Sequence, residues 1–224
     1  MKKFSFSIPF LAAAAISTAS VSAAPLPQSA ELHYTGNYGI PAVMTFTRSG
    51  SRYKVVSNIK VPLYSIRFES GGTVSGSRLI PSYYQDVRGG KPYAGAKFGG
   101  GKISYGKAGQ QQTRAASGTT MDLFTLAWQL AAADGKLPPG LNVTNGKKIY
   151  PVSGLTRTGS GSYKIAGSST PVNKYRLRRG DSTVNYAFAP ELGNIPVQIS
   201  YTDEGKTYNL KLTKAKINGR AVQK

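Results

Sequence analysis

The chain of 224 residues contains no cysteine and a single histidine, His33. Without cysteine the protein has no disulfide bond and no thiolate nucleophile. A lone histidine without cysteine does not make a familiar zinc site, and the 9 acidic residues are too scattered to suggest ligand spacing. We therefore predict no metal site and no cofactor, and we interpret His33 as a structural residue of a strand.

Motifs that carry catalytic chemistry are also missing. No G-x-S-x-G sequence occurs, so a nucleophile elbow is not indicated. The glycine run at 99–101 lacks a following Lys-Ser/Thr pair and a helix, so it is not a phosphate-binding loop. Serine and lysine are common, yet nothing singles out a Ser-Lys dyad. We predict a protein that is not an enzyme and has no catalytic residues.

Acidic residues are few compared with the 29 Lys and Arg residues. Without Lys2 and Lys3, which belong to the predicted leader, 27 cations face 9 acids, a formal charge of +18. Such a field favours anionic partners such as lipid head groups, lipopolysaccharide, nucleic acid or acidic glycans. The cations are spread along the chain in runs of no more than two, which argues against a dedicated nucleic-acid stripe.

Long apolar runs are absent except at the start of the chain. Met1, Lys2 and Lys3 precede an apolar run over 4–19, and small residues at 21–23 follow. This pattern predicts a secretory signal peptide over 1–23, with cleavage between Ala23 and Ala24. No later stretch is apolar enough to cross a bilayer. We expect residues 24–224 to form a single β-rich domain in the periplasm, with the cell surface or the medium as alternatives.

One stretch has helical periodicity, over about 120–134. Its apolar residues recur at the spacing of one helix face, at Leu123, Leu126, Ala127, Leu130 and Ala131. Phe124 and Trp128 widen that face, so the helix must be covered by the surrounding sheet. If Trp128 is buried, its indole N–H will need a partner.

The ends of this helix are marked by capping signals. Thr119 followed by Asp122 resembles a capping box, and we interpret Asp122 as a cap rather than a catalytic acid. Gly135 suits a left-handed stop, and Pro138 and Pro139 prevent continuation.

The rest of the chain reads as short strands separated by glycine-rich turns. Apolar and polar residues alternate most clearly over 42–47, 53–59, 65–70, 78–84, 92–98, 102–105, 175–177, 184–188, 197–201 and 208–212. Asn145-Gly146 indicates a type I′ hairpin turn, Gly159–Gly161 indicates another turn, and 110–118 reads as a polar, mobile approach to the helix. The fold class is therefore mainly β. We expect an antiparallel meander of about ten or more strands, as a strongly curved sheet or open barrel enclosing the helix.

The densest polar and aromatic cluster lies over 81–93. Tyrosine rings beside Arg and Lys suit an acidic, partly apolar ligand at the mouth of the sheet, with a further contact at the helix. The candidate ligand-binding residues are Tyr83, Tyr84, Arg88, Lys91, Tyr93 and Trp128. The alternative is structural, a hairpin with cross-strand tyrosine packing and an Asp–Arg pair.

Several motifs in order carry a resemblance to a family. They are Leu26–Tyr34, Arg48–Tyr53, Leu79–Arg88, Met121–Leu130 and Ala189–Val197. On these the chain resembles an uncharacterised family of exported bacterial proteins, a domain of unknown function. The resemblance implies a curved antiparallel sheet around one helix, similar in outline to periplasmic lipoprotein and lipid carriers, and implies no catalytic residues.

Two functions remain open from the sequence. The first is a non-enzymatic periplasmic protein that binds an apolar or amphipathic, anionic, lipid-like ligand in a β-barrel-like cavity. The second is a basic scaffold that docks on lipopolysaccharide, peptidoglycan or an envelope protein partner. An apolar tunnel beside Trp128 would favour the carrier, and a solid interior would favour the scaffold.

Overall fold

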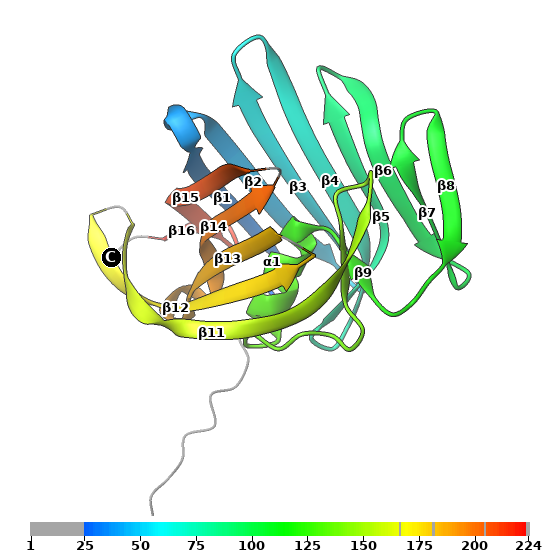
Figure 1. Ribbon diagram of the computed structural model, residues 1–224. Coiled ribbons are helices and arrows are strands. Elements are labelled where there is room, and N and C mark those ends of the chain that lie inside the picture. Colours follow the sequence, from blue (N-terminus) through cyan, green and yellow to red (C-terminus); the bar gives the residue numbers. More distant parts are fainter. Residues whose placement is uncertain (1–24, 166, 181, 204, 223–224) are drawn as a thin grey trace, which may run out of the picture.

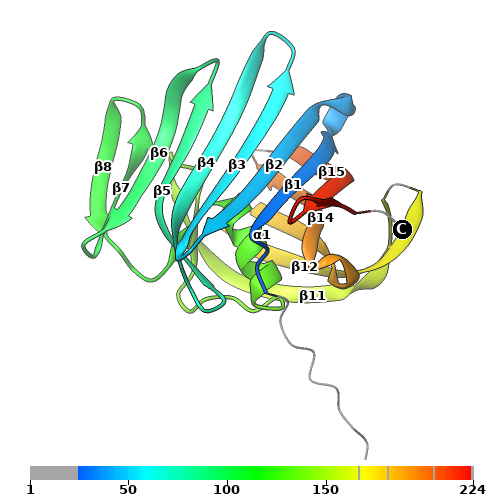
Figure 2. The ribbon, with the colours of Figure 1, turned by 180° about the vertical axis from the view of Figure 1, so that it is seen from behind.

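The computed structural model describes residues 25–165, 167–180, 182–203 and 205–222. The predicted signal peptide and its cleavage site lie outside the described residues. The described chain is mainly β, with 16 strands in one large curved sheet and one α-helix (Figures 1 and 2). The predicted fold class is confirmed.

The first half of the chain builds one wing of the sheet as an antiparallel meander. Each strand pairs with the next along the chain, because tight turns join them. The strands of this wing are β1 (Ser29–Gly36), β2 (Pro41–Ser49), β3 (Arg52–Val61), β4 (Tyr64–Ser75), β5 (Arg78–Arg88), β6 (Lys91–Gly99), β7 (Lys102–Lys107) and β8 (Gln110–Ala115). A short 3₁₀ helix, η1 (Asn37–Gly39), joins β1 to β2.

The second half starts at the far edge and returns to β1. Its elements are β9 (Thr120–Met121), α1 (Leu123–Ala132), β10 (Asn142–Thr144), β11 (Ile149–Ile165), β12 (Ser168–Arg179), β13 (Ser182–Ala189), η2 (Pro190–Leu192), β14 (Ile195–Asp203), β15 (Lys206–Ile217) and β16 (Arg220–Ala221). Strands β9 and β10 are parallel, and β15 pairs with β1. The predicted antiparallel meander therefore forms within each wing, and the segment containing α1 separates the two.

The sheet curves back on itself without closing. Its strand order runs from β8 at one edge to β9 at the other. The loop after β10 nevertheless reaches the first wing, where the Gly106 N–H donates to the Gly146 carbonyl at 2.8 Å. On this open side the two wings thus meet through loop contacts, whereas on the other side the β1–β15 ladder joins them.

Asp122 defines the start of α1. Its carboxylate accepts hydrogen bonds from the backbone N–H groups of Phe124 at 2.9 Å and Thr125 at 3.0 Å. Asp122 is therefore the N-cap of α1, a position at which Asp is among the preferred residues. The predicted capping box, with Thr119 at the N-cap, is wrong, because Thr120 and Met121 pair with β10. The predicted stop holds, since Gly135 adopts a φ of 74° and its N–H donates to the Leu130 carbonyl.

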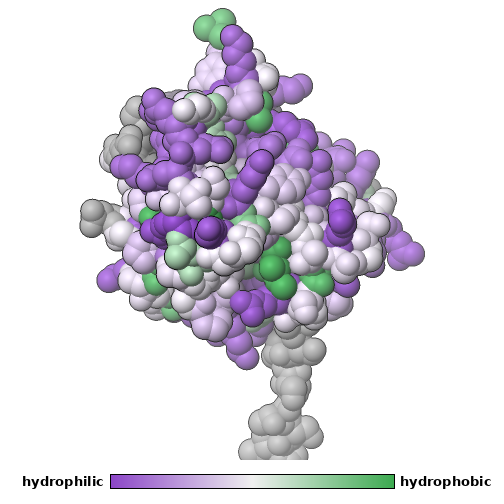
Figure 3. Space-filling view, turned by 90° about the vertical axis from the view of Figure 1, so that its right-hand side faces the viewer, coloured by the Kyte–Doolittle hydropathy of each residue, from purple (hydrophilic) through white to green (hydrophobic). Residues whose placement is uncertain are grey.

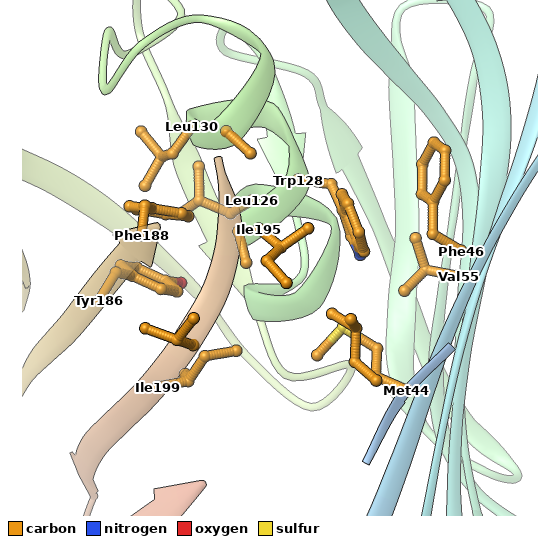
Figure 4. Packing of buried hydrophobic residues seen from close by; sticks show 14 of the residues in the cluster. Met44, Phe46, Val55, Leu126, Trp128, Leu130, Tyr186, Phe188, Ile195 and Ile199 are labelled. Atoms are coloured by element: carbon orange, nitrogen blue, oxygen red, sulfur yellow. The ribbon is translucent and has the colours of Figure 1, made fainter. Parts of the chain in front are cut away.

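The helix is apolar nearly all round because it lies between the two wings (Figure 4). On one side Trp128 packs on Phe46 of β2, with ring centroids 4.6 Å apart. On the other side Leu126 and Leu130 face Phe188 and other residues of the second wing. Both wings therefore share one core, with the helix as its centre.

Three turn or loop predictions differ from the structure. The glutamines at 110–112 belong to strand β8, since backbone pairing with β7 does not need apolar side chains. The predicted turn at 159–161 lies inside β11, where Gly159 marks a shift of register against β12. Asn145-Gly146 is not a two-residue turn, because Thr144 pairs with Ile149 and leaves four residues in the loop.

Candidate functional site

The candidate site lies on strand β5, on the side of the sheet that faces α1. Tyr84 and Asp86 are 5% and 3% exposed. The strand partner of Asp86 is Phe68, whose ring lies 5.3 Å from that of the helix residue Phe124. Because alternate residues of a strand share a face, Arg88 lies on this side too.

Asp86 and Arg88 form the predicted Asp–Arg pair of the hairpin. Arg88 Nη2 donates to Asp86 Oδ2 at 2.9 Å, and Arg88 Nε donates to Oδ1 at 3.1 Å. Burial alone would lower the pKa of Arg88, but the hydrogen bond to Asp86 raises it. The carboxylate thus holds a permanently charged guanidinium in a defined position while 37% of the Arg88 side chain stays exposed.

A β-bulge places Tyr93 beside this pair. Asp86 pairs with Ala94 and Val87 with Pro92, so Tyr93 is the extra residue of the bulge. Bulges re-aim side chains in this way. The Arg88 guanidinium carbon lies 3.8 Å from the centroid of the Tyr93 ring, which is a close cation–π contact.

A second cation reaches the same ring from the other wing. The ammonium of Lys147 lies 5.8 Å from the Tyr93 centroid. Its backbone is fixed by Asn145, whose side-chain oxygen accepts from the N–H groups of Lys147 at 3.1 Å and Lys148 at 3.0 Å. Tyr84, Asp86, Arg88, Tyr93 and Lys147 are hereafter called the Arg88 cluster.

Aromatic rings continue from the cluster toward the helix. Phe68 stacks on Tyr84 with centroids 6.4 Å apart and also contacts Phe124. Both phenylalanines are half-buried. Burial, followed by the charges of Asp122 and Asp86, raises the pKa of Tyr84 well above 10.0, so its hydroxyl stays neutral. The cluster therefore combines two cations with a partly exposed aromatic surface.

The other three predicted ligand-binding residues are not members of the Arg88 cluster. Tyr83 faces the opposite side of the sheet, where its hydroxyl donates to Glu69 at 2.9 Å. Lys91 is exposed at the start of β6, where it is the cross-strand partner of Arg88. Trp128 has no exposed surface and belongs to the core. Its indole nitrogen has no hydrogen-bond partner among the described residues, so the expected partner is not found.

Sequence reasoning missed Lys147, Phe68 and Phe124 as members or neighbours of the site. Each lies in a different part of the chain from the segment 81–93. No local pattern marks them, since the loop after β10 reaches Tyr93 only through the curvature of the sheet. Gly146 permits this approach because it has no side chain. A Cβ at this position would lie 2.9 Å from the backbone nitrogen of Gly95, which is too close.

Neither a metal-binding cluster nor a membrane-spanning helix is found among the described residues. They contain no group of three His, Asp or Glu side chains that could hold a metal ion. Within the same part of the chain, no helix has both the length and the apolar character needed to span a bilayer.

Comparison with known proteins gives a likeness of fold. No protein-family model matches the chain, and no curated protein matches it either. Among solved structures, it is similar to a β-barrel-like protein of a domain of unknown function, DUF1849, from Brucella abortus. The TM-score is 0.53 at 9% sequence identity, over 87% of this chain and 99% of that chain. At this identity the likeness shows a shared barrel-like fold, while the predicted export and the resemblance to carriers stay predictions.

Proposed function

We propose that the protein is a non-enzymatic binding protein of the bacterial periplasm that takes an amphipathic, anionic, lipid-like ligand at the Arg88 cluster. The barrel-like fold supports this proposal, since concave sheets of this kind offer one face for a ligand. The excess of cations in the chain favours a ligand of negative charge.

The observation that carries the proposal is the meeting of Arg88 and Lys147 at the Tyr93 ring. Arg88 and Lys147 lie 3.8 Å and 5.8 Å from the ring centroid and come from opposite wings. Asp86 neutralises part of this charge but is itself buried, so the exposed groups are cationic. The half-buried rings of Phe68 and Phe124 extend from the cluster and suit the apolar part of the same ligand.

The ligand site proposed here is not beside Trp128. The indole is fully buried and packs against Phe46, with ring centroids 4.6 Å apart. A ligand that displaced this contact would have to separate the two wings from their shared helix. The half-buried Tyr93 ring and the cations of the Arg88 cluster need no such rearrangement.

The test compares two single-chain lipids that differ in head-group charge. Binding of lysophosphatidylglycerol and lysophosphatidylcholine is measured by native mass spectrometry and calorimetry. We expect the anionic lipid to bind more tightly. Lys147→Gln should weaken its binding about threefold to tenfold, as expected for the loss of one partly exposed cation.

Lys97→Gln is the matched control, because Lys97 is an exposed lysine of the same hairpin whose strand partner, Tyr83, faces the opposite side of the sheet. Its affinity should equal that of the wild type. Equal binding of the two lipids, or equal losses in the two variants, would count against the proposal.

A second candidate is a basic scaffold that docks on lipopolysaccharide, peptidoglycan or an envelope protein. The tight packing of Trp128 in the core favours it, as does the surface in Figure 3, where hydrophilic residues are spread over the face shown and hydrophobic residues form only small patches. Docking of this kind would weaken steeply with salt. The test is sedimentation with lipopolysaccharide at 20 mM and 500 mM salt, which are about a tenth and about three times the physiological concentration. Electrostatic docking should be lost at the higher concentration, whereas salt-insensitive binding would contradict this candidate.

A further inference from the structure

A pocket of about 280 Å³ lies at the other end of strand β5 from the Arg88 cluster. It forms where β5 begins, β6 ends and β7 begins, under the segment 116–120 that leads to α1. Leu79 and Arg88 are nine residues apart on β5, which corresponds to about 30 Å along a strand. The pocket and the cluster are therefore separate sites.

The interior of the pocket is apolar. Its apolar lining residues come from three strands and are Leu79, Ile80, Pro81, Phe98 and Ile103. Leu79 and Ile103 are almost fully buried, whereas Ile80 is 45% exposed. The volume lies just below the roughly 300–1,000 Å³ of ordinary ligand pockets, so it suits one short chain rather than a two-tailed lipid.

The mouth of the pocket is positively charged. Arg78 and Lys102 belong to the lining, which contains no Asp or Glu. Both side chains are exposed, and neither takes part in the ion pairs found between described residues. Arg78 donates to the Thr119 hydroxyl at 3.0 Å, which holds its guanidinium at the wall. An anionic group here would meet two cations without a competing carboxylate.

The wall also contains a buried hydroxyl that lacks a partner. Thr120 is 5% exposed, and its Oγ1 makes no hydrogen bond with the described residues. Such a group is costly to bury unless something pairs with it. It lies in the lining of the same pocket.

The segment over the pocket is fixed in place. The Ala116 N–H donates to the Gly101 carbonyl at 2.8 Å. Gly118 has a φ of 83°, and a Cβ there would lie 2.2 Å from the Gly140 carbonyl oxygen. This contact requires glycine, so the wall packs on the neighbouring loop and the pocket is preformed.

We propose that this pocket binds a single-chain anionic amphiphile, namely a medium-chain fatty acid. The carboxylate lies between Arg78 and Lys102, and the alkyl chain fills the space between Leu79, Phe98 and Ile103. The proposal needs neither the Arg88 cluster nor the function proposed for it, since the two sites share no residue.

The test measures decanoate binding by calorimetry with the full mature chain. We expect the double variant Arg78→Gln/Lys102→Gln to bind decanoate about tenfold more weakly, as expected for two exposed charges, and 1-decanol to bind the wild type more weakly than decanoate. Lys97→Gln is the matched control, because Lys97 is an exposed lysine of β6 outside the lining. Failure of the wild type to bind decanoate, or equal losses in Lys97→Gln, would overturn the proposal.

A blocking variant gives a second measurement that does not depend on charge. Ala116 is exposed and lines the pocket, whereas its neighbour Ser117 is exposed and does not. Ala116→Phe should abolish decanoate binding while Ser117→Phe keeps it, with urea unfolding showing that both variants fold. Equal binding by the two variants would contradict the assignment.

The source of the acyl chain is distinguished with phosphatidylglycerol vesicles. If the wild type floats with the vesicles and Ala116→Phe does not, the pocket takes a chain of a membrane lipid, and the assignment to a free fatty acid is overturned. Decanoate binding without such flotation would show a free fatty acid. Lys147→Gln should leave decanoate binding at the pocket unchanged, so failure of this proposal and failure of the Arg88 cluster are distinguishable.

Discussion

The Thr125 hydroxyl donates to the Asp122 carboxylate at 2.6 Å, inside the protein and three residues along the same helix. The other carboxylate oxygen accepts two backbone N–H groups, and Thr125 also contacts the Ser70 hydroxyl of β4 at 2.7 Å. One buried acid thus caps the helix and, through Thr125, ties it to the first wing. Its role is structural, and it explains where α1 begins.

Asp122→Ala should lower the free energy of unfolding by about 2–3 kcal/mol, because it removes an N-cap and leaves a buried hydroxyl with one partner fewer. Urea unfolding followed by circular dichroism measures this change. Thr119→Ala is the control, since Thr119 is not the cap, and it should cost less than about 1 kcal/mol, the usual value of a lost cap. Equal losses in the two variants would restore the capping-box interpretation.

Gly146→Ala should be more destabilising than Gly76→Ala. Both glycines have a positive φ, of 82° and 58°, so both variants carry backbone strain. A Cβ at Gly146 would also lie 3.0 Å from the Tyr84 ring, whereas nothing lies within 4 Å of one at Gly76. The extra cost should be about 1–3 kcal/mol, the usual range for overpacking, in thermal or urea unfolding. Identical stabilities would mean that the loop does not pack on the first wing.

The stabilising contribution of ionised Glu69 should be lost in acid. Burial raises its pKa, but hydrogen bonds from Lys54, Arg67 and Tyr83 outweigh burial and lower the pKa below 4.5. The charged form is favoured in the folded state, so this contribution is present above about pH 4.5 and is lost as the pH falls through the lowered pKa. Glu69→Gln should flatten the acid limb of a plot of unfolding free energy against pH. An unchanged slope would show that the Lys54–Glu69 contact of 2.7 Å has no net effect.

The buried tyrosines should make the protein sensitive to alkali. Burial raises the pKa of Tyr34, Tyr53, Tyr84 and Tyr186 above 10.0, and raises that of Tyr83 to about 12. The neutral form is favoured in the folded state, so this stability is complete below pH 10 and is lost as the pH rises further.

Absorbance at 295 nm measures tyrosine ionisation, and circular dichroism measures unfolding. The two signals should change together for the buried tyrosines above pH 10, whereas in 8 M urea, well above the midpoint of ordinary domains, ionisation should centre near 10. Complete ionisation at pH 10 with native circular dichroism would contradict the burial of these side chains.

Part of the Arg88 cluster could be predicted from the sequence. Tyr84, Arg88 and Tyr93 stand close together in one hairpin, and the Asp86–Arg88 pair is a local feature of alternate residues on one strand. Tyr83 could not be placed, because neighbouring residues of a strand face opposite sides and the pattern does not say which side is concave. Lys147 required the curvature of the whole sheet.

The sequence by itself determined the class of the fold, since period-two alternation, glycine turns and one helical stretch are local properties of the chain. It also determined the end of the helix and the surplus of positive charge. Only the tertiary structure decided the strand order, with β15 beside β1 and the segment containing α1 linking two wings. Pairing between distant strands depends on contacts across about 190 residues, such as Ala30 with Ile217, and no local pattern records which partner such a strand will find.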